Sequence, residues 1–587
     1  MLKPCIASCI FEAMHVFRFY TLLILCCYSL LLSSQNTSPT YAGIIATFDS
    51  LAKTSPFAEL TVAGTTDVGK PLHLFVLSAD KIFDPAKAKQ AGKLVLLINN
   101  GIHPGEPDGI DACIRLSREW CKNPKSLPKD VVICIVPVFN VDGALNRNKT
   151  SRANQNGPEE YGFRGNARNL DLNRDFTKCD AANTRSLVAT FTAWDPDVFV
   201  DTHVSDGADY QYTMTLIATH HQKLNPAAGK FLKNEMLPML YRDMEQRGQR
   251  MAPYVETFGR TPESGIVGFM DTPRYSTGYA ALFNTFGFVT ETHMWKPFAD
   301  RVNATVDFLN VLISYSSSHA GAIRTARKQA NEEMMKENLV RYNWQLDTTR
   351  HDTLLFHGYK AVYSTSNISG KERLMYDKTQ PVTFTVKHFN YYNAGDSSII
   401  PDYYVIPQAW HEVITRLQLN GVAMKRLVRD TVISFSASRI KSYSTVRQPY
   451  ESHYMHYDTE VEDVKYSMHL YTGDYIVSTQ QRARKYLVTV MEPKSNDSFW
   501  AWNFFDGITS QKEWFSDYIF EEKAEQVLLS NPTLKAQLDS AKQADAKLRE
   551  DHWLQLNFIY QRSEFKEPSH NIYPVVRWTG TLPFSVK

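Results

Sequence analysis

The sequence of 587 residues has no excess of charge of either sign, with 64 Lys and Arg residues against 62 Asp and Glu residues. A protein that binds nucleic acid needs a basic excess on at least one of its faces. The composition therefore provides no support for a nucleic-acid partner. Hydrophobic residues make up 43% of the chain and charged residues 21%, which is typical of folded globular proteins. At roughly 100–200 residues per domain, a chain of this length is expected to contain two to four domains.

Cysteine is also scarce outside the N-terminal segment. The chain has eight cysteines, and four of them lie within residues 1–35. The others are Cys113, Cys121, Cys134 and Cys179. They are too few for the dense disulfide framework of a small secreted domain. None belongs to a Cys-x-x-Cys pair, so a structural zinc site of that type is not predicted, and the spacing leaves open a single disulfide among the four.

Long apolar runs are absent except near the N-terminus. Residues 19–32 are uncharged over 14 positions, which is shorter than the about 20 residues that a membrane-spanning helix needs. Basic residues precede this run, and Ser33 and Ser34 follow it. A basic flank, a short apolar run and small residues are typical of a secretory signal peptide. We therefore expect a signal peptide at residues 1–35, with Met14 as an alternative start, and a secreted or periplasmic protein without a stable membrane span.

Two other interpretations of this N-terminal run are less favoured. Cys26 and Cys27 suggest a lipid anchor, but a bacterial lipoprotein signal has a small residue just before the cysteine, and Leu25 is not small. A buried apolar helix is the second alternative. The basic flank and the following serines favour the signal peptide over both.

Strand-like and helix-like segments alternate from about residue 41 to residue 318. The strand candidates are residues 93–98, 131–139, 198–200 and 287–290, and a helix is expected at residues 107–120. The first two strand candidates are continuous apolar runs, which is the pattern of strands buried on both faces. The alternation predicts an α/β domain with a mostly parallel or mixed central sheet flanked by helices. Such sheets bind ligands at the C-terminal ends of their strands.

The second half of the chain has a different composition. Residues 320–339 are charged and Ala-rich, which predicts a solvated connecting helix. From about residue 343 to residue 492, runs of Tyr, Val, Thr and Ser broken by turn residues predict a β-rich domain, and helices are expected again at the C-terminal end. We therefore divide the chain into a signal peptide (1–35), an α/β domain (41–318), a connecting helix (319–342) and a β-rich C-terminal domain with a helical end (343–587).

Metal-binding side chains follow two of the predicted strands. His103 and Glu106 stand at His-x-x-Glu spacing in a Pro-Gly turn just after the strand at 93–98, and His203 ends the later strand. Imidazole nitrogens and carboxylate oxygens are common zinc ligands, and a catalytic zinc site has three protein ligands and one open position. Taken singly, each residue also fits an ordinary surface or strand-end position. Together they predict a site for one zinc ion per chain.

These motifs and three later segments, in the same order, resemble the zinc carboxypeptidase family, the relatives of pancreatic carboxypeptidase A. Residues 137–143 (PVFNVDG) are similar to the family's P-x-x-N-x-D-G segment, and residues 170–176 (LDLNRDF) to its G-x-D-x-N-R-x-F segment. Residues 287–291 (GFVTE) resemble the strand that delivers the catalytic Glu. The resemblance covers about residues 45–315, so the α/β domain is expected to be the catalytic one.

The resemblance implies a role for each matching residue. His103, Glu106 and His203 would bind zinc, which would polarise a water molecule and the scissile carbonyl. Glu291 would act as the general base and then as the general acid. His293 lies two residues further on, hence on the same face of the strand. It either tunes Glu291 or simply packs there.

The substrate would be a peptide or peptide-like molecule with a free carboxylate. The resemblance assigns the binding of that carboxylate to Asn173 and Arg174, and the planar guanidinium suits a bidentate contact. The family's mobile substrate tyrosine does not align cleanly, and Tyr275 and Tyr279 are the candidates. Arg274 is expected to face the same pocket, where it would favour an acidic group, although an ordinary surface position fits it equally well.

The family also has an arginine that stabilises the developing oxyanion by charge directed at the transition state. It should lie upstream of Asn173, and an insertion at residues 155–165 makes its position uncertain. The candidates by position are Arg147, Arg152, Arg164 and Arg168. Arg152 is our choice on spacing.

The leading interpretation is a zinc metallocarboxypeptidase, a hydrolase that cleaves C-terminal peptide bonds. A deacylase or a peptidoglycan stem-peptide amidase on the same fold is the first alternative. A zinc-free binding protein, with the C-terminal half as its working part, is the second. Residues 403–407 and 497–503 are expected to be packed core, and aromatic platforms for glycans are the alternative for these segments.

Overall fold

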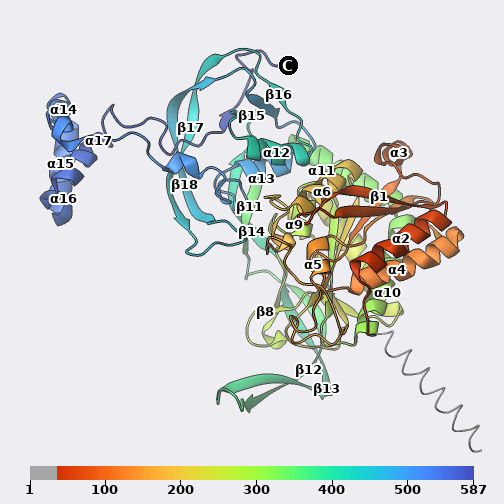
Figure 1. The fold of residues 1–587 in the computed structure, drawn as a ribbon. Coiled ribbons are helices and arrows are strands. Elements are labelled where there is room, and N and C mark those ends of the chain that lie inside the picture. Colours follow the sequence, from red (N-terminus) through yellow and green to blue (C-terminus); the bar gives the residue numbers. More distant parts are fainter. Residues whose placement is uncertain (1–35) are drawn as a thin grey trace, which may run out of the picture.

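The computed structural model describes residues 36–587, and the predicted signal peptide at residues 1–35 lies outside the described residues (Figure 1). Within the described range, no helix combines the length and the apolar character needed to cross a bilayer. The four cysteines of this range are all free thiols: Cys113, Cys121, Cys134 and Cys179. The open question of a disulfide among them is therefore answered in the negative.

A mixed eight-stranded sheet forms the centre of the first half of the chain, in the order β1-β2-β4-β3-β5-β10-β6-β7. The four central strands β4, β3, β5 and β10 run parallel. The strands β1 and β2 pair antiparallel with their neighbours, β6 pairs antiparallel with β10, and β7 pairs parallel with β6. The strands are β1 (Ala58–Thr65), β2 (Pro71–Leu77), β3 (Leu94–Asn99), β4 (Val131–Val136), β5 (Val198–Ser205), β6 (Met214–Ala218), β7 (Met251–Pro253) and β10 (Phe286–His293). Every residue of β3 and β4 is buried, as their continuous apolar runs predict. The predicted α/β class is confirmed.

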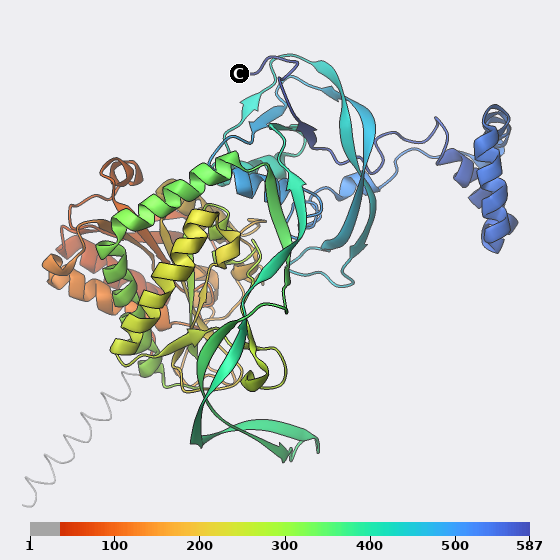
Figure 2. The ribbon, with the colours of Figure 1, turned by 180° about the vertical axis from the view of Figure 1, so that it is seen from behind.

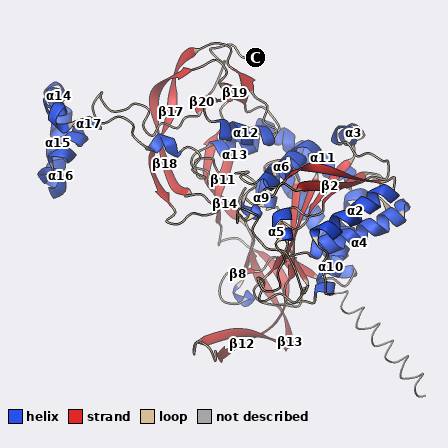
Figure 3. Cartoon of the chain, in the orientation of Figure 1, coloured by secondary structure: helices blue, strands red, loops and turns tan. Residues whose placement is uncertain are grey.

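Helices cover both faces of this sheet (Figure 3). One face carries α2 (Tyr41–Thr54), α4 (Asp108–Lys122), α7 (Pro226–Phe231), α8 (Leu237–Gln246), α10 (Phe298–Ser318) and α11 (Ala320–Lys336). The other carries α3 (Pro85–Gln90), α5 (Val141–Leu145), α6 (Ala182–Trp194) and α9 (Ser276–Ala281). The sheet is therefore shielded from water on both faces, and only its edges and strand ends can present functional groups.

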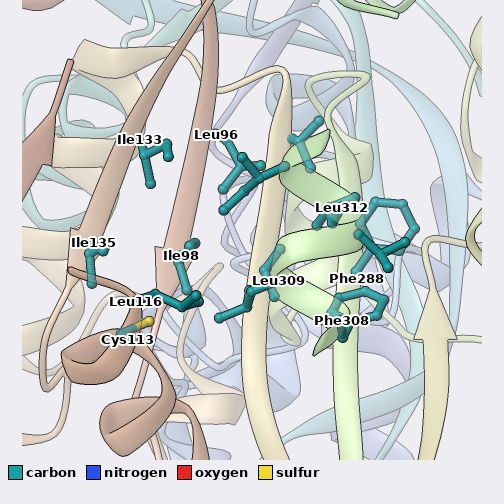
Figure 4. Close-up of a cluster of buried hydrophobic side chains, with 14 of the residues drawn as sticks. Leu96, Ile98, Cys113, Leu116, Ile133, Ile135, Phe288, Phe308, Leu309 and Leu312 are labelled. Atoms are coloured by element: carbon teal, nitrogen blue, oxygen red, sulfur yellow. The ribbon is translucent and has the colours of Figure 1, made fainter. Parts of the chain in front are cut away.

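The core on the first face is built from long apolar side chains of α10 and the central strands (Figure 4). Phe308 and Leu312 of α10, Leu96 and Ile98 of β3, and Phe288 of β10 are all fully buried. Burying one such side chain contributes about 1.5–3 kcal/mol. This core holds the parallel strands in register, and their ends carry the candidate site.

The helix α11 corrects one expectation. It begins at Ala320 as predicted, but it is not solvated along its length, because Ile323 and Ala330 are fully buried against the first half. Arg327 lies on the same side and pairs with Asp197 at 3.1 Å. The charged, Ala-rich composition did not indicate this buried face. Alanines at helical spacing form a narrow apolar stripe that packs against a core, although their small side chains add little to the hydrophobicity of the segment.

The second half of the chain is β-rich, as predicted. Its strands are β11 (Leu339–Leu346), β12 (Asp352–Thr365), β13 (Glu372–Phe389), β14 (Tyr392–Ile399), β15 (Tyr403–Ile406), β16 (Lys425–Arg426), β17 (Thr431–Thr445), β18 (His456–Leu470), β19 (Tyr475–Ser478) and β20 (Val576–Trp578). Two short strands of the first half, β8 (Glu256–Thr257) and β9 (Ile266–Val267), join β12 and β13 in one sheet. The two halves therefore share a sheet.

Helices of the second half fall into two groups. The helices α12 (His411–Leu419) and α13 (Arg484–Met491) pack into a second hydrophobic core, which lies on the face of the central sheet that carries α6 and α9. The helices α14 (Asp517–Ser530), α15 (Pro532–Ala544), α16 (Ala546–Glu550) and α17 (His552–Tyr560) form a separate cluster that projects from the body (Figures 1 and 2). The long β12–β13 hairpin projects in another direction.

The aromatic residues of segment 497–503 belong to the packed interior. Phe499, Trp500 and Trp502 have no exposed surface. Tyr404 in the other aromatic segment is equally buried. Exposed glycan platforms are therefore excluded for these side chains, and the packed-core expectation is confirmed.

Candidate zinc site

Strand register brings the predicted zinc ligands together. His103 and Glu106 lie in the turn that follows β3, and His203 lies near the end of β5, the parallel neighbour of β3. Glu291 in β10 stands directly opposite His203 across the next parallel pair. The C-terminal ends of these three strands meet at one edge of the sheet, which is where open α/β sheets bind ligands.

The three metal-binding side chains converge around one point. His103 Nδ1 lies 3.2 Å from Glu106 Oε1, and His203 Nδ1 lies 3.2 Å from Glu106 Oε2. One ligand atom from each residue lies within 4.8 Å of the others, and all three residues are buried. The buried His103 Nδ1 has no hydrogen-bond partner among the described residues. Two imidazole nitrogens and a carboxylate with this geometry fit a zinc ion with one open position.

Each imidazole is oriented by a second carboxylate. His103 Nε2 lies 2.9 Å from Asp171 Oδ1, and His203 Nε2 lies 3.0 Å from Asp201 Oδ2. These contacts direct the opposite nitrogen, Nδ1, towards Glu106, as carboxylate–histidine–metal arrangements do. Burial raises the pKa of the Asp171 carboxyl, but the nearby His103, Arg164 and Arg174 together outweigh this and hold that pKa well below its usual range.

Sequence reasoning missed both orienting carboxylates. Asp171 lies within the segment LDLNRDF that carries part of the family resemblance, and Asp201 precedes His203 by two residues. Side chains two residues apart in a strand lie on the same face. That spacing was an available signal for Asp201.

Two of the four candidate oxyanion arginines line the site. Arg152 Nη1 donates to Glu106 Oε1 at 3.0 Å, and Gly105 makes this approach possible, because a Cβ there would lie 2.7 Å from Arg152 Cδ. Arg164 lies 3.6 Å from Glu106 Oε1 and 2.9 Å from Asp171 Oδ2. The other two bind backbone carbonyls elsewhere: Arg147 and Arg168.

These groups open into a cavity of about 570 Å³ that also contains the predicted carboxylate-binding residues. Asn173 and Arg174 line it, on a short 3-10 helix that follows Asp171. The Arg174 guanidinium lies 4.5 Å from the centre of the Tyr275 ring, which lines the same cavity. The apolar part of the wall consists of Ile217, Tyr254, Phe269, Val289 and Met294.

Three other candidates do not face this cavity. Arg274 donates from Nε to Asp497 Oδ1 at 2.7 Å, so its charge is used against the second half of the chain. Tyr279 is fully buried and donates its hydroxyl to Asn420 Oδ1 at 2.7 Å. His293 Nδ1 lies 3.5 Å from Asp209 Oδ1, in the loop between β5 and β6, and not against Glu291. Of the two tyrosines considered, only Tyr275 is placed to contact a substrate.

Glu291 sits in an environment that disfavours its ionised form. Burial is the main cause that raises the pKa of Glu291, Glu106 and Asp201 contribute to the rise, and His203 opposes it, so that the pKa is about 8. A divalent cation bound by the three ligands would favour the carboxylate instead. The protonation state of Glu291 is therefore linked to metal binding.

Comparison with known proteins agrees with this site. Residues 44–234 match the family model described as zinc carboxypeptidase. Carboxypeptidase 2 of Trichophyton rubrum is 23% identical over 480 residues, which cover 76% of this chain and 81% of that protein. Carboxypeptidase 2 of Trichophyton equinum is 23% identical over 449 residues, which cover 74% and 78%.

Solved structures of the same kind are also similar. A metallo-carboxypeptidase from Burkholderia cenocepacia is 16% identical, with a TM-score of 0.35, and the match covers 46% of this chain and 68% of that one. Carboxypeptidase A from Helicoverpa armigera is 13% identical, with a TM-score of 0.35, and the match covers 48% and 74%. From the family match over residues 44–234, the curated relatives and the His103–Glu106–His203 cluster, we conclude that the α/β half of the chain is a domain of the zinc carboxypeptidase family and that the protein is a hydrolase of the metallocarboxypeptidase type.

Proposed function

We propose that this protein binds one zinc ion and removes C-terminal residues from peptides, with Glu291 as the general base. The observation that supports this most directly is the position of Glu291. It stands opposite His203 in the paired strands and lines the same cavity as the anchor residues Asn173 and Arg174. Ligands, base and carboxylate anchor therefore surround a single space.

Bound zinc would supply Lewis acidity, which activates a water molecule and polarises the scissile carbonyl. The Glu291 carboxylate would take a proton from that water and later pass it to the leaving amine. The low polarity of its surroundings supports both steps, because a buried carboxyl can hold the proton between them. Asp171 and Asp201 keep the two imidazoles fixed throughout.

Arg152 and Arg164 supply positive charge beside the ligand Glu106. A guanidinium in this position would stabilise negative charge that develops on the carbonyl oxygen in the transition state. Arg152 is the more buried of the two, with 13% of its side chain exposed against 45% for Arg164. We therefore assign the oxyanion role to Arg152.

Arg174 and Asn173 would bind the free carboxylate of the substrate. The planar guanidinium can form two parallel hydrogen bonds with a carboxylate. Tyr275 stacks on that guanidinium and would cover the terminal residue. A peptide whose last carboxylate is anchored here has its final peptide bond closest to the zinc ligands, which is the basis for exopeptidase action.

A digest of a peptide library by the purified protein, analysed by mass spectrometry, tests the proposal. We expect stepwise loss of C-terminal residues, one zinc ion per chain, and loss of activity on chelation that zinc restores. Peptides amidated at the C-terminus should resist cleavage. Internal cleavage, or release of acyl groups without peptide hydrolysis, would overturn the assignment and favour the deacylase alternative.

We also propose that the protein is exported. The uncharged run at residues 19–32, with its basic flank, supports this. N-terminal sequencing of the protein recovered from outside the cytoplasm tests it. A mature N-terminus after about residue 35 is expected, and an intact N-terminus on cytoplasmic protein would contradict export.

A further inference from the structure

A second cavity, of about 260 Å³, lies between the two halves of the chain. The segment 269–277 lines both cavities with different residues. Phe269 and residues 275–277 face the zinc cavity, whereas residues 270–273 face the second one. The second cavity thus adjoins the active site but contains none of its ligands.

A buried ammonium and two buried polar groups without hydrogen-bond partners lie together in this second cavity. Lys485 Nζ donates to the carbonyl of Lys223 and lies 3.4 Å from Asn225 Oδ1. Asn225 is only 2% exposed, and its Nδ2 amide has no partner among the described residues. The same holds for the hydroxyl oxygen of Thr272. Burying a donor without an acceptor costs about 1–3 kcal/mol, so the arrangement calls for an acceptor in the cavity.

The positive charge of Lys485 is also uncompensated by a direct ion pair. Three acidic residues line the cavity: Asp271, Glu337 and Asp497. Asp271 pairs with Lys223 at 3.1 Å, and Asp497 pairs with Arg274. Burial, with a smaller contribution from the charge of Lys223, lowers the pKa of Lys485 to about 8, and Glu337 opposes this without forming an ion pair with Lys485 in the described structure. An anionic group in the cavity would satisfy the ammonium and the amide at the same time.

The cavity also has an apolar part of its wall, beside polar lining residues such as Gln222 and Arg341. The apolar part includes Leu224, Pro226, Met270, Leu282, Val340 and Trp344. Small-molecule sites are typically apolar pockets with a few well-placed polar groups, and this volume is close to the lower end of their range. The lining therefore fits a small molecule that has an acidic head and an apolar body.

We propose that the second cavity is a binding site for a small amphipathic carboxylate. Its carboxylate would accept hydrogen bonds from Lys485 and the Asn225 amide, and its apolar group would lie against Met270 and Leu282. Nothing in this assignment depends on the peptidase activity, because no ligand or base of the zinc site lines the cavity.

Binding of 4-fluorophenylacetate, followed by fluorine NMR, tests the proposal. The Arg174→Met variant is used as the background, so that the zinc cavity loses its carboxylate anchor. We expect saturable binding in this background, weakened at least tenfold by Lys485→Met or by Asn225→Leu. Lys230→Met, which removes an exposed lysine outside the cavity, should leave it unchanged. The matched amine, 4-fluorobenzylamine, should not bind.

Binding that survives both cavity substitutions would overturn the proposal. A crystal of the unaltered chain soaked in 4-bromophenylacetate provides a second measurement that does not depend on variants folding. A bromine anomalous peak is expected against the apolar wall. Ordered water alone beside Lys485 and Asn225, with bromine absent, would show that solvent satisfies these donors and would refute the site.

Discussion

Glu291 and His203 occupy paired positions on adjacent parallel strands, and this places the proposed general base beside a proposed metal ligand. The pairing is a property of the backbone, so it does not depend on a flexible loop. Residues on rigid elements hold catalytic geometry more precisely than residues on loops. This arrangement allows the base to be tested separately from the metal.

The variant Glu291→Gln removes the proton acceptor while keeping the shape of the side chain. We expect turnover to fall by about 10²–10⁴-fold, which is the usual contribution of a general base. The zinc content should remain at one ion per chain, because the three ligands are untouched. Steady-state kinetics and metal analysis of the same preparation measure both. Glu263→Gln, at an exposed glutamate, is the control, and full activity of Glu291→Gln would exclude the assigned role.

The variant Arg174→Lys keeps the positive charge but loses the planar fork that suits a carboxylate. Losing one charge-assisted hydrogen bond costs about 1.5–3 kcal/mol, so KM should rise about 10- to 100-fold. The kcat value should change much less. Arg118→Lys, at an exposed site, serves as the control. An equal KM for the variant and the unaltered chain would show that Arg174 does not anchor the substrate.

At the scale of single residues, the sequence predicted those site residues whose positions depend on neighbouring sequence. His103 and Glu106 were identifiable because one turn carries both, and His203 and Glu291 because each ends an apolar strand. The expectation that Arg274 faces the substrate pocket was wrong, because its position depends on a distant contact. Its partner Asp497 lies more than 200 positions away, and a local sequence pattern cannot predict such a contact.

Among the elements, the contact between α4 and β5 is unusually close. Gly109 lies in the first turn of α4, and a Cβ at this position would come within 2.4 Å of the Cβ of Thr202 in β5 and 2.5 Å of Asn100 Oδ1. Thr202 immediately precedes the ligand His203. The helix can therefore approach the metal-binding strand only because position 109 lacks a side chain.

The variant Gly109→Ala should push α4 away from β5. Overpacking of a buried contact usually costs about 1–3 kcal/mol, so the melting temperature should fall, and zinc affinity should fall with it. Calorimetry and a competitive zinc titration measure the two effects. Gly321→Ala is the matched control, because its added methyl group in α11 would meet no atom within 4 Å apart from its own helix backbone and chain neighbours. Equal stability of Gly109→Ala and the unaltered chain would contradict this account of the packing.

The elements that were easiest to predict are the ones with unambiguous periodicity. The strands β3 and β4 consist almost entirely of branched apolar residues, and their fully buried pattern follows from that. The helix α11 was predicted in the right place but with the wrong environment. Its alanines carry too little hydrophobic signal to reveal which side faces the core.

The two halves of the molecule share one packed interior. The second core contains Phe191 and Tyr279 from the first half together with Tyr486 and Trp500 from the second. The second half also reaches the zinc site, since Glu451 accepts a hydrogen bond from the backbone nitrogen of Asp171 at 2.8 Å. The C-terminal half therefore supports the segment that orients a metal ligand. A contact between residues 280 positions apart cannot be predicted from local sequence patterns.

His453 is a second point of support and one that depends on pH. Its Nε2 lies 2.7 Å from Asp180 Oδ2, at the end of the segment that carries Arg174. Burial lowers the pKa of His453, but Asp180 more than compensates, and the pKa is raised overall despite the opposing charge of Lys178. Lys178 and Arg416 also bind Asp180, which keeps that carboxyl ionised.

Because the pKa of His453 is higher in the folded chain than the usual value of about 6.5, protonated His453 stabilises the fold fully below about pH 6.5. This contribution is lost as the pH rises through the raised pKa of the folded state. A hydrogen bond between charged groups is worth about 1.5–3 kcal/mol. His453→Gln should therefore lower the melting temperature most at about pH 6 and least at about pH 9. Thermal unfolding across this range measures the difference, with the exposed His411→Gln as the control. A deficit of His453→Gln that grows towards alkaline pH would mean that neutral His453 makes the stabilising contact, and the linkage argued here would be wrong.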